Sequence, residues 1–288
     1  MITFVTFHVD CNKNTINYLS KSCPSIAKNY DFKSLINLLF RSASIFHPDC
    51  KKVILTDKKT DWSHLDGNIE IHRFKMDQKQ LMLSRLIAQI NYLKNHDFSS
   101  DLILIDSDML VNGNLESLFK NNFDIALTYR HNKFKMPING GIIFISKNKK
   151  QKALKFMQTM LKIFKSNYYR HNAWWGDQEA LIDIVGYKNF INRKSNIMNT
   201  ENIKILLLPQ KKYNFSPANR MSSIFFKLKN KKIIHFNGER KRFMPFYWNV
   251  YLSHLENSNF NNLIKSFWYK TFLIYSAVVE LFVHIITK

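Results

Sequence analysis

The sequence contains 288 residues, of which 45% are hydrophobic and 22% are charged, so it can form a sizeable core and is not disordered as a whole. Only 7 Gly and 6 Pro are present, which excludes collagen-like and Pro-rich low-complexity chains. The 43 Lys and Arg against 21 Asp and Glu give a formal net charge of +22, which indicates anionic partners such as polyanions, anionic lipids or phosphorylated ligands.

The three cysteines, Cys11, Cys23 and Cys50, have neither the spacing of a zinc site nor that of a disulfide framework. The chain begins with the β-like run Met-Ile-Thr-Phe-Val-Thr-Phe, without the basic region and long apolar segment of a signal peptide. Both observations predict a cytoplasmic protein in a reducing compartment.

Strand-like and helix-like segments alternate along the first part of the chain. Asp77, followed by Gln80, is typical of a capping box at the start of a helix. Short β-branched or aromatic runs predict strands at residues 2–7, 52–56, 69–74 and 102–105. Apolar periodicity predicts helices at residues 33–46 and 78–95. This order predicts an α/β fold with a largely parallel sheet covered by helices.

Polar residues follow three of these strands, and ligands of such sheets bind at the carboxyl ends of the strands. These residues are His8–Asn12, Asp57 and Asp106–Asp108. Further along the chain, strands are predicted at residues 123–129 and 141–146, and an amphipathic helix at residues 151–165. Asp177 is expected to N-cap a short helix that runs through Val185 and ends at Gly186. We assign residues 1–258 to a single domain.

Residues 259–288 are predicted to form an apolar helical tail. The run from Thr271 to Thr287 contains Glu280 and is shorter than the about 20 apolar residues that a helix needs to span a bilayer. Two interpretations stay open, a helix lying in the membrane interface and a terminal helix buried against the domain. Eleven Lys and Arg within residues 204–242 favour contact with an anionic membrane, so we expect a peripheral protein on its cytoplasmic face.

Two carboxylates, Asp106 and Asp108, directly follow an apolar strand. Two like charges buried at the end of a core strand are costly unless a cation neutralises them. A divalent ion such as Mg²⁺ or Mn²⁺ can do so and can also bridge the oxygens of a diphosphate. The pair therefore predicts a metal site, although Asp-Ser-Asp by itself also fits a solvated turn capped by Ser107.

This pattern resembles the Asp-x-Asp motif of the nucleotide-sugar glycosyltransferases with the GT-A fold, and in particular the family-8-type galactosyl- and glucosyltransferases. The resemblance covers about residues 1–245 and implies a Rossmann-like mixed sheet flanked by helices. It implies that Asp106 and Ser107 contact the donor, together with Arg85 from the helix before the motif. Asp10 and Asn12 lie where the relatives hold the nucleobase.

Asn139-Gly140-Gly141 resembles the family's Asn-x-Gly segment before an apolar strand. Two glycines allow the backbone to approach a bound sugar closely, and the Asn amide can contact sugar hydroxyls. The resemblance implies that all three residues bind the donor.

Trp174-Trp175-Gly176-Asp177-Gln178 resembles the family's Asp-Gln segment near the reacting centre. It implies catalytic roles for Asp177, which would accept hydrogen bonds from donor-sugar hydroxyls, and for Gln178, which lies near the anomeric carbon in the relatives. Trp174 and Trp175 could stack on an acceptor sugar. Without the resemblance, the segment would be interpreted as a helix start after an aromatic core loop.

His235-Phe-Asn-Gly238-Glu-Arg-Lys241 fits the family's His-x-x-Gly-x-x-Lys motif. The resemblance implies that His235 completes the metal site with Asp106 and Asp108, and that Gly238 and Lys241 contact the diphosphate. Neutral imidazole is a good Mn²⁺ ligand, and a lysine can neutralise a leaving phosphate. The family usually continues Lys-Pro-Trp, whereas here Arg242 and Phe243 follow Lys241.

Together these motifs predict a glycosyltransferase that uses Mn²⁺ or Mg²⁺ and moves a sugar from a UDP-sugar to a glycan or glycolipid acceptor, in the assembly of a bacterial-type surface polysaccharide or lipopolysaccharide. The family-8 resemblance implies retention of anomeric configuration. An inverting reaction would need a carboxylate base, for which Asp177 or Glu179 could serve. Two other hypotheses are a basic nucleic-acid-binding protein and a non-catalytic membrane scaffold. We expect no nucleic-acid partner, because no known nucleic-acid-binding motif is present.

Overall fold

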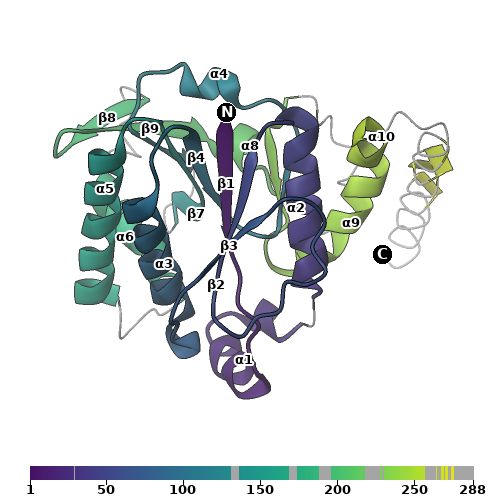
Figure 1. Cartoon of the computed structure of the whole chain (residues 1–288), viewed down its shortest axis with the longest axis horizontal. Helices are drawn as coiled ribbons and strands as arrows, with labels where there is room; N and C mark the ends of the chain where they lie inside the picture. Colours follow the sequence, from purple (N-terminus) through teal and green to yellow (C-terminus); the bar gives the residue numbers. More distant parts are fainter. Residues whose placement is uncertain are drawn as a thin grey trace, which may run out of the picture.

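The computed structural model describes residues 1–28, 30–130, 136–168, 174–187, 196–217, 228, 230–256, 264, 267, 268, 270, 271, 274 and 275. Within these residues, eight strands form one mixed sheet with helices on both of its faces (Figure 1). The strands are β1 (Ile2–Phe7), β2 (Lys51–Thr56), β3 (Glu70–Arg73), β4 (Asp101–Ile105), β6 (Ile125–Tyr129), β7 (Ile138–Ile145), β8 (Ile197–Thr200) and β9 (Ile203–Pro209). A separate two-stranded sheet consists of β5 (Met109–Val111) and β10 (Ile233–His235).

The strand order of the large sheet is β3-β2-β1-β4-β7-β6-β9-β8. Strands β3, β2, β1 and β4 are parallel neighbours, as the order of elements in the sequence predicts. Strand β7 is antiparallel to both β4 and β6, β6 is parallel to β9, and β8 is antiparallel to β9. The carboxyl ends of β1, β2, β3, β4, β6 and β9 therefore lie at the same edge of the sheet.

The longer α-helices cover the sheet, and short helical segments connect the other elements. The α-helices are α1 (Lys13–Ser20), α2 (Phe32–Phe46), α3 (Leu81–Asn95), α4 (Glu116–Phe119), α5 (Lys150–Ile163), α6 (Gly176–Val185), α8 (Gln210–Tyr213), α9 (Met244–Tyr247) and α10 (Ser253–Glu256). 3₁₀-helices span Pro24–Ala27, Gln78–Gln80 and Gly238–Phe243. π-helical turns span Phe164–Tyr168 and Trp248–Leu252.

Alternate residues of the central strands pack against helices on opposite faces of the sheet. In β1, Phe4 belongs to the cluster that contains Leu39 and Phe40 of α2, whereas Val5 belongs to the cluster that contains Leu86 of α3. Because both faces are buried, β1 and β4 have almost continuous apolar sequences. The predicted α/β class, a mixed sheet flanked by helices, is confirmed.

Of the two hydrogen bonds in the predicted capping box before α3, the one accepted by Asp77 is present and the one accepted by Gln80 is not. Asp77 does accept a hydrogen bond from the backbone N–H of Lys79, but its own N–H donates to the Ser84 hydroxyl rather than to Gln80. The α-helix consequently begins at Leu81, after the short helix Gln78–Gln80. A serine one turn further along the helix supplies the acceptor that the capping box would have taken from glutamine.

Two predicted strands differ in extent. The strand predicted at residues 123–129 begins only at Ile125, and the strand predicted at residues 141–146 begins already at Ile138. The Asn-Gly-Gly segment therefore belongs to β7, where Asn139 pairs with Thr128 of β6 beyond an irregularity in their register.

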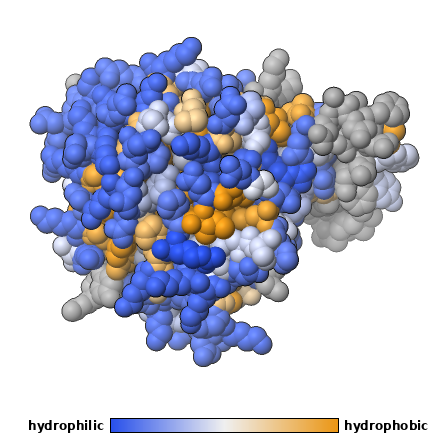
Figure 2. Space-filling model, in the orientation of Figure 1, coloured by the Kyte–Doolittle hydropathy of each residue, from blue (hydrophilic) through white to orange (hydrophobic). Residues whose placement is uncertain are grey.

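Most of the predicted tail, residues 259–288, lies outside the described residues. Among the residues that are described, no helix is long and apolar enough to cross a membrane. Hydrophilic residues cover most of the face shown in Figure 2, and a hydrophobic area lies near its middle.

Candidate functional site

The turn after β4 carries Asp106, Ser107 and Asp108 to the carboxyl edge of the sheet. Strand β5 begins directly after this turn and pairs antiparallel with β10, with His235 opposite Met109. The N–H of Phe236 donates to the carbonyl oxygen of Asp108 at 2.8 Å. Backbone pairing thus brings a histidine from the last part of the chain to the two aspartates.

The three predicted metal ligands lie together. His235 Nε2 is 3.3 Å from Asp108 Oδ1 and 3.9 Å from Asp106 Oδ2. One ligand atom from each residue lies within 4.8 Å of the others. Asp108 and His235 are buried, and Asp106 is half-buried. Two carboxylates and one imidazole in this arrangement suit a divalent ion such as Mn²⁺ or Mg²⁺.

A buried hydrogen-bond network orients the His235 ring. Asn214 Nδ2 donates to Thr128 Oγ1 and to Asn139 Oδ1, both at 2.9 Å, which uses both of its hydrogens. Asn214 Oδ1 therefore accepts from His235 Nδ1, at 2.9 Å. The other ring nitrogen, Nε2, faces the carboxylates and is therefore the one available to a metal ion.

Asn214 is a site residue that the sequence did not indicate. It lies after α8, in no recognisable motif, and becomes part of the site only because the next residue, Phe215, pairs with β10 beside His235. Asn139, predicted to bind the donor, uses its side-chain oxygen for Asn214 and for the N–H of Gly141. The structure thus gives Asn139 a supporting position behind His235.

Two cations balance the acidic residues. Arg85 of α3 donates to Asp106 at 2.7 Å and also pairs with Asp177, whereas Lys241 Nζ lies 2.7 Å from Asp108 Oδ2. Burial raises the pKa of Asp106, and the charge of Asp108 raises it further, against the opposing effect of Arg85. Burial also acts to raise the pKa of Asp108, but the charges of Lys241 and His235 outweigh it and hold that pKa well below its ordinary value.

The expectation that Asp177 N-caps a helix is wrong. Helix α6 already begins at Gly176, its N-cap is Trp175, and that residue makes no capping side-chain hydrogen bond. Asp177 is buried in the first turn and binds Arg85 instead. The predicted end of the helix at Gly186 is confirmed, with a φ of 79° that favours glycine.

The two glycines of β7 leave room for neighbouring polar groups. A Cβ atom on Gly141 would lie 2.6 Å from Asp106 Oδ2, so only glycine fits beside that carboxylate in this position. The N–H of Gly140 donates to Gln178 Oε1 at 3.1 Å, and a Cβ there would lie 3.0 Å from Gln178 Cγ. Gln178 is buried and anchored to the strand that passes the aspartates.

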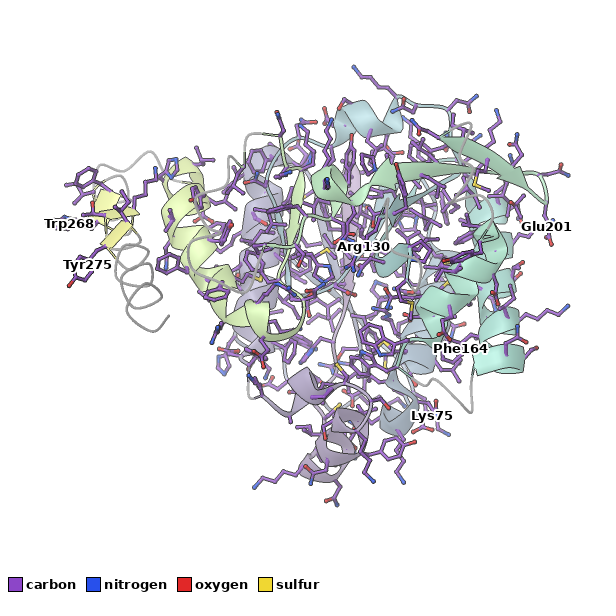
Figure 3. All side chains as sticks on the ribbon, turned by 180° about the vertical axis from the view of Figure 1, so that it is seen from behind. Lys75, Arg130, Phe164, Glu201, Trp268 and Tyr275 are labelled. Carbon is purple, nitrogen blue, oxygen red and sulfur yellow. The ribbon has the colours of Figure 1, made fainter. Side chains whose placement is uncertain are left out.

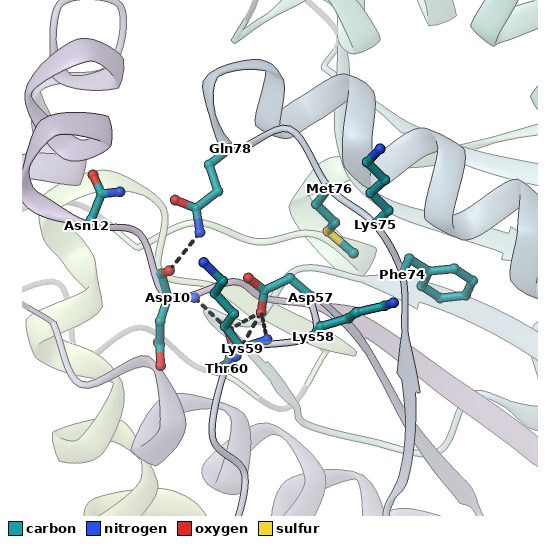
Figure 4. A pocket seen from close by; sticks show the side chains of 10 residues that line it. All are labelled: Asp10, Asn12, Asp57, Lys58, Lys59, Thr60, Phe74, Lys75, Met76 and Gln78. Atoms are coloured by element: carbon teal, nitrogen blue, oxygen red, sulfur yellow. Dashed lines mark hydrogen bonds between the residues drawn. The ribbon is translucent and has the colours of Figure 1, made fainter.

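Asp10 and Asn12 line a cavity of about 430 Å³, whose lining includes none of the three predicted metal ligands. Asn12 caps α1 by accepting from the N–H of Thr15, and the Asp10 carboxylate faces His8. Figure 4 shows the ten residues that line the cavity: Asp10, Asn12, Asp57, Lys58, Lys59, Thr60, Phe74, Lys75, Met76 and Gln78. They come from the ends of β1, β2 and β3 and the segments that follow.

The remaining predicted residues lie in different surroundings. Trp174 packs partly into a small apolar cluster with Leu19 and Met82, whereas Trp175 exposes 40% of its surface. Gly238 has a φ of 64°, a backbone conformation that favours glycine, and opens the helix that carries Lys241.

Comparison with known proteins supports the fold. No protein-family profile and no curated protein matches the sequence. The structure is similar to the glycosyltransferase GlyE of Streptococcus pneumoniae TIGR4, with a TM-score of 0.51 and 14% identity over 94% of this chain. The chain has the GT-A fold. It spans only 64% of the length of that GlyE chain, and the similarity at this identity shows the fold alone.

Two further GT-A structures are similar with lower scores. A glycosyltransferase involved in glycosylation of the major capsid of PBCV-1 has a TM-score of 0.48 and 15% identity, over 85% of this chain and 98% of the other. The galactosyltransferase LgtC, in complex with donor and acceptor sugar analogues, has a TM-score of 0.48 and 12% identity, over 90% of this chain and 96% of the other.

Proposed function

We propose that this protein is a metal-dependent glycosyltransferase that moves a sugar from a UDP-sugar to a glycan or glycolipid acceptor with retention of configuration. The observation that carries the proposal is the convergence of Asp106, Asp108 and His235, whose ligand atoms lie within 4.8 Å of one another at the carboxyl edge of a GT-A sheet. Nucleotide-sugar chemistry needs such a cation site because a diphosphate leaves the sugar.

The site residues fit Mn²⁺ or Mg²⁺. The ligand set combines two carboxylates with an imidazole whose Nε2 faces them, and Gly141 keeps space beside Asp106. A bound ion would supply positive charge that stabilises the negative charge growing on the diphosphate as the glycosidic bond breaks. Lys241, next to Asp108, would contribute a second positive charge to the same diphosphate.

Arg85, Asp177 and Gln178 would position the donor sugar. Arg85 joins Asp106 to Asp177, so the metal ligand and the sugar-binding carboxylate are held in one arrangement. Gln178 uses its Oε1 on Gly140, which leaves its amide nitrogen to donate a hydrogen bond near the anomeric carbon.

Retention agrees better with these contacts than inversion does. Asp177 accepts from Arg85 with one oxygen and from the N–H of Gln178 with the other, at 2.7 Å. Both interactions favour a carboxylate that orients its neighbours rather than one that removes a proton from an acceptor hydroxyl. Glu179 is the other residue that could act as the base of an inverting reaction.

The cavity beside Asp10 and Asn12 would receive the nucleobase. It is formed at the ends of β1, β2 and β3, the neighbours of β4, so a nucleotide placed there directs its phosphates towards Asp106 and Asp108. Three lysines outnumber two aspartates among the lining residues, and this excess of positive charge suits a phosphorylated ligand.

An acceptor in surface-polysaccharide or lipopolysaccharide assembly would be presented at an anionic membrane surface. Phe267 and Trp268 expose 66% and 65% of their surfaces, and Figure 3 shows Trp268 and Tyr275 at one end of the molecule. Exposed aromatic residues next to lysines bind the membrane interface. Replacing Phe267 and Trp268 with serine should abolish cosedimentation of the full chain with vesicles that contain anionic lipid; unchanged cosedimentation would contradict membrane contact through these residues.

Ligand-dependent thermal stability tests the proposed activity. UDP with Mn²⁺ should stabilise the protein by about 2.7 kcal/mol at 100 times its Kd, whereas UDP without a divalent ion should stabilise it far less. Asp108→Asn and His235→Ala should lose the Mn²⁺-dependent part, and exposed Asp97→Asn should retain it. Full Mn²⁺-dependent stabilisation or donor hydrolysis in the two site variants would contradict the metal assignment.

A further inference from the structure

Two arginines near the cluster have no acidic partner among the residues that the structure describes. Arg130 directly follows β6, whose carboxyl end lies at the same edge of the sheet as that of β4 because both strands are antiparallel to β7. Arg240 lies between Gly238 and Lys241 in the helix Gly238–Phe243. Figure 3 shows Arg130 near the middle of the molecule.

The contacts of the two guanidinium groups are with neutral groups. Arg130 Nε donates to Gln210 Oε1, and Arg240 Nη1 donates to Asn237 Oδ1 at 2.7 Å. Arg240 Nε is buried and has no hydrogen-bond partner among the described residues. Within the same residues no carboxylate makes a salt bridge to either arginine, in contrast to Arg85, which has two.

The charge of Arg240 also acts on Arg130. Burial lowers the pKa of Arg130, and the nearby positive charge of Arg240 lowers it further. Burial lowers the pKa of Arg240 as well. Both side chains are half-buried, and a pair of neighbouring cations withdrawn from water is unfavourable unless an anion compensates it.

The rest of the sequence does not offer that anion. Residues 131–135 and 218–227, which adjoin the described parts near Arg130 and Arg240, contain no Asp or Glu. Among all residues outside the described set, the sequence contains one acid, Glu280, in the apolar tail. The compensating charge is therefore expected from a ligand.

We propose that Arg130 and Arg240 together bind an anionic group, a carboxylate or a phosphate, on the acceptor, so that the acceptor is an acidic or phosphorylated glycan. This inference rests on the proposed function. The planar guanidinium group donates paired hydrogen bonds that match carboxylate and phosphate oxygens.

The position of the pair in the sheet favours the acceptor over the donor. The proposed nucleobase cavity lies at the ends of β1, β2 and β3, and the metal ligands follow β4. Arg130 follows β6, which is separated from β4 by β7 on the side away from β1. A donor that extends from the cavity to the aspartates leaves the β6 side of the site for the second substrate.

Binding of paired acidic and neutral sugars tests the proposal. The full chain with saturating UDP and Mn²⁺ is titrated with methyl β-D-glucuronide against methyl β-D-glucoside, and with glucose 6-phosphate against glucose. At least one acidic sugar should bind about 10-fold or more tightly than its neutral counterpart, since a hydrogen bond to a charged group contributes about 10- to 100-fold in affinity. Arg130→Gln and Arg240→Gln should each remove the preference for the acidic sugar. Arg130→Lys should retain part of that preference.

Arg242→Gln is the matched control, because Arg242 is exposed in the same helix, and it should keep the preference. Equal binding of acidic and neutral sugars would overturn the proposal. Equal binding of inorganic phosphate and glucose 6-phosphate would reduce the pair to a general anion site and would also overturn it. The proposal would also be overturned if Arg130→Gln and Arg240→Gln weaken the binding of UDP–Mn²⁺ as much as the binding of the acidic sugar, because the pair would then bind the donor. Failure of the proposed function is seen separately, as absence of UDP–Mn²⁺ binding to the unchanged protein.

Discussion

Gly141→Ala places a methyl group against a metal ligand without removing any ligand. The added Cβ would lie 2.6 Å from Asp106 Oδ2, where ordinary contact begins at 3.4 Å, so the carboxylate must move by about 0.8 Å. Bonds from oxygen to Mg²⁺ are about 2.0–2.1 Å long and tolerate deviations of about 0.2 Å. The required movement is therefore several times larger than the metal site can absorb. Asn139 Oδ1 and Met109 Cε, each 2.9 Å from the same Cβ, oppose relaxation in other directions.

We expect Gly141→Ala to weaken Mn²⁺ binding by about 10- to 100-fold, a typical cost of disturbing the shell around a ligand. Overpacking should also destabilise the protein by about 1–3 kcal/mol. Calorimetric titration with Mn²⁺ measures the first effect and urea unfolding measures the second. Gly113→Ala is the control, since its Cβ would meet only the flexible side chain of Lys232, at 3.2 Å. Wild-type Mn²⁺ affinity in folded Gly141→Ala protein would refute the reasoning.

Three further variants test the surroundings of the site and of the core. Asn214→Ala removes the acceptor that orients His235 Nδ1–H, so Mn²⁺ affinity measured by calorimetry should fall by about 10- to 100-fold although all ligands remain. Arg85→Gln leaves two acidic residues without their shared cation and should destabilise the protein by about 3–5 kcal/mol in urea unfolding without divalent ions. Burial lowers the pKa of His47, whose Nε2 accepts a hydrogen bond from the N–H of Leu115. The neutral imidazole therefore contributes fully to stability above pH 6.5, the ordinary pKa of histidine. This contribution is lost as the pH falls below that value, because the unfolded chain binds a proton more readily. The stability difference between the wild type and His47→Gln should therefore decrease from pH 7.5 to pH 5.5.

Each of these expectations has a result that would contradict it. Unchanged Mn²⁺ affinity in Asn214→Ala would show that the imidazole orientation does not depend on this amide. A loss below about 1 kcal/mol in Arg85→Gln would show that the two carboxylates do not need their cation in the folded chain. A stability difference for His47→Gln that is constant between the two pH values would show that this histidine does not titrate on unfolding.

The sequence predicted best those features that depend on neighbouring residues. The parallel half of the sheet followed from short apolar runs between helical segments, and Asp106 and Asp108 were recognised because they directly follow such a run. Placing His235 beside them required the resemblance to the GT-A enzymes, because its proximity results from the pairing of β10 with β5.

Features that depend on distant contacts were missed or misinterpreted. Asp177 has the local pattern of an N-cap, yet Arg85, 92 positions away, binds its carboxylate. Asn214 follows the short helix α8 and resembles an ordinary polar loop residue in the sequence, yet it bonds to Thr128 and His235. In both cases a charged or buried partner from another element outweighs the local preference, and no short pattern encodes that partner.

The pairing of β10 with β5 also has a consequence for biosynthesis. A ribosome makes both aspartates long before it reaches Ile233, so the growing polypeptide holds two adjacent carboxylates without the histidine. Domains fold from the amino-terminal side during translation, and the early strands can associate while the later ones are still missing. An ion at the proposed site could therefore take its final geometry only after β10 has been made, and any product that terminates before β10 would lack one of the three proposed ligands.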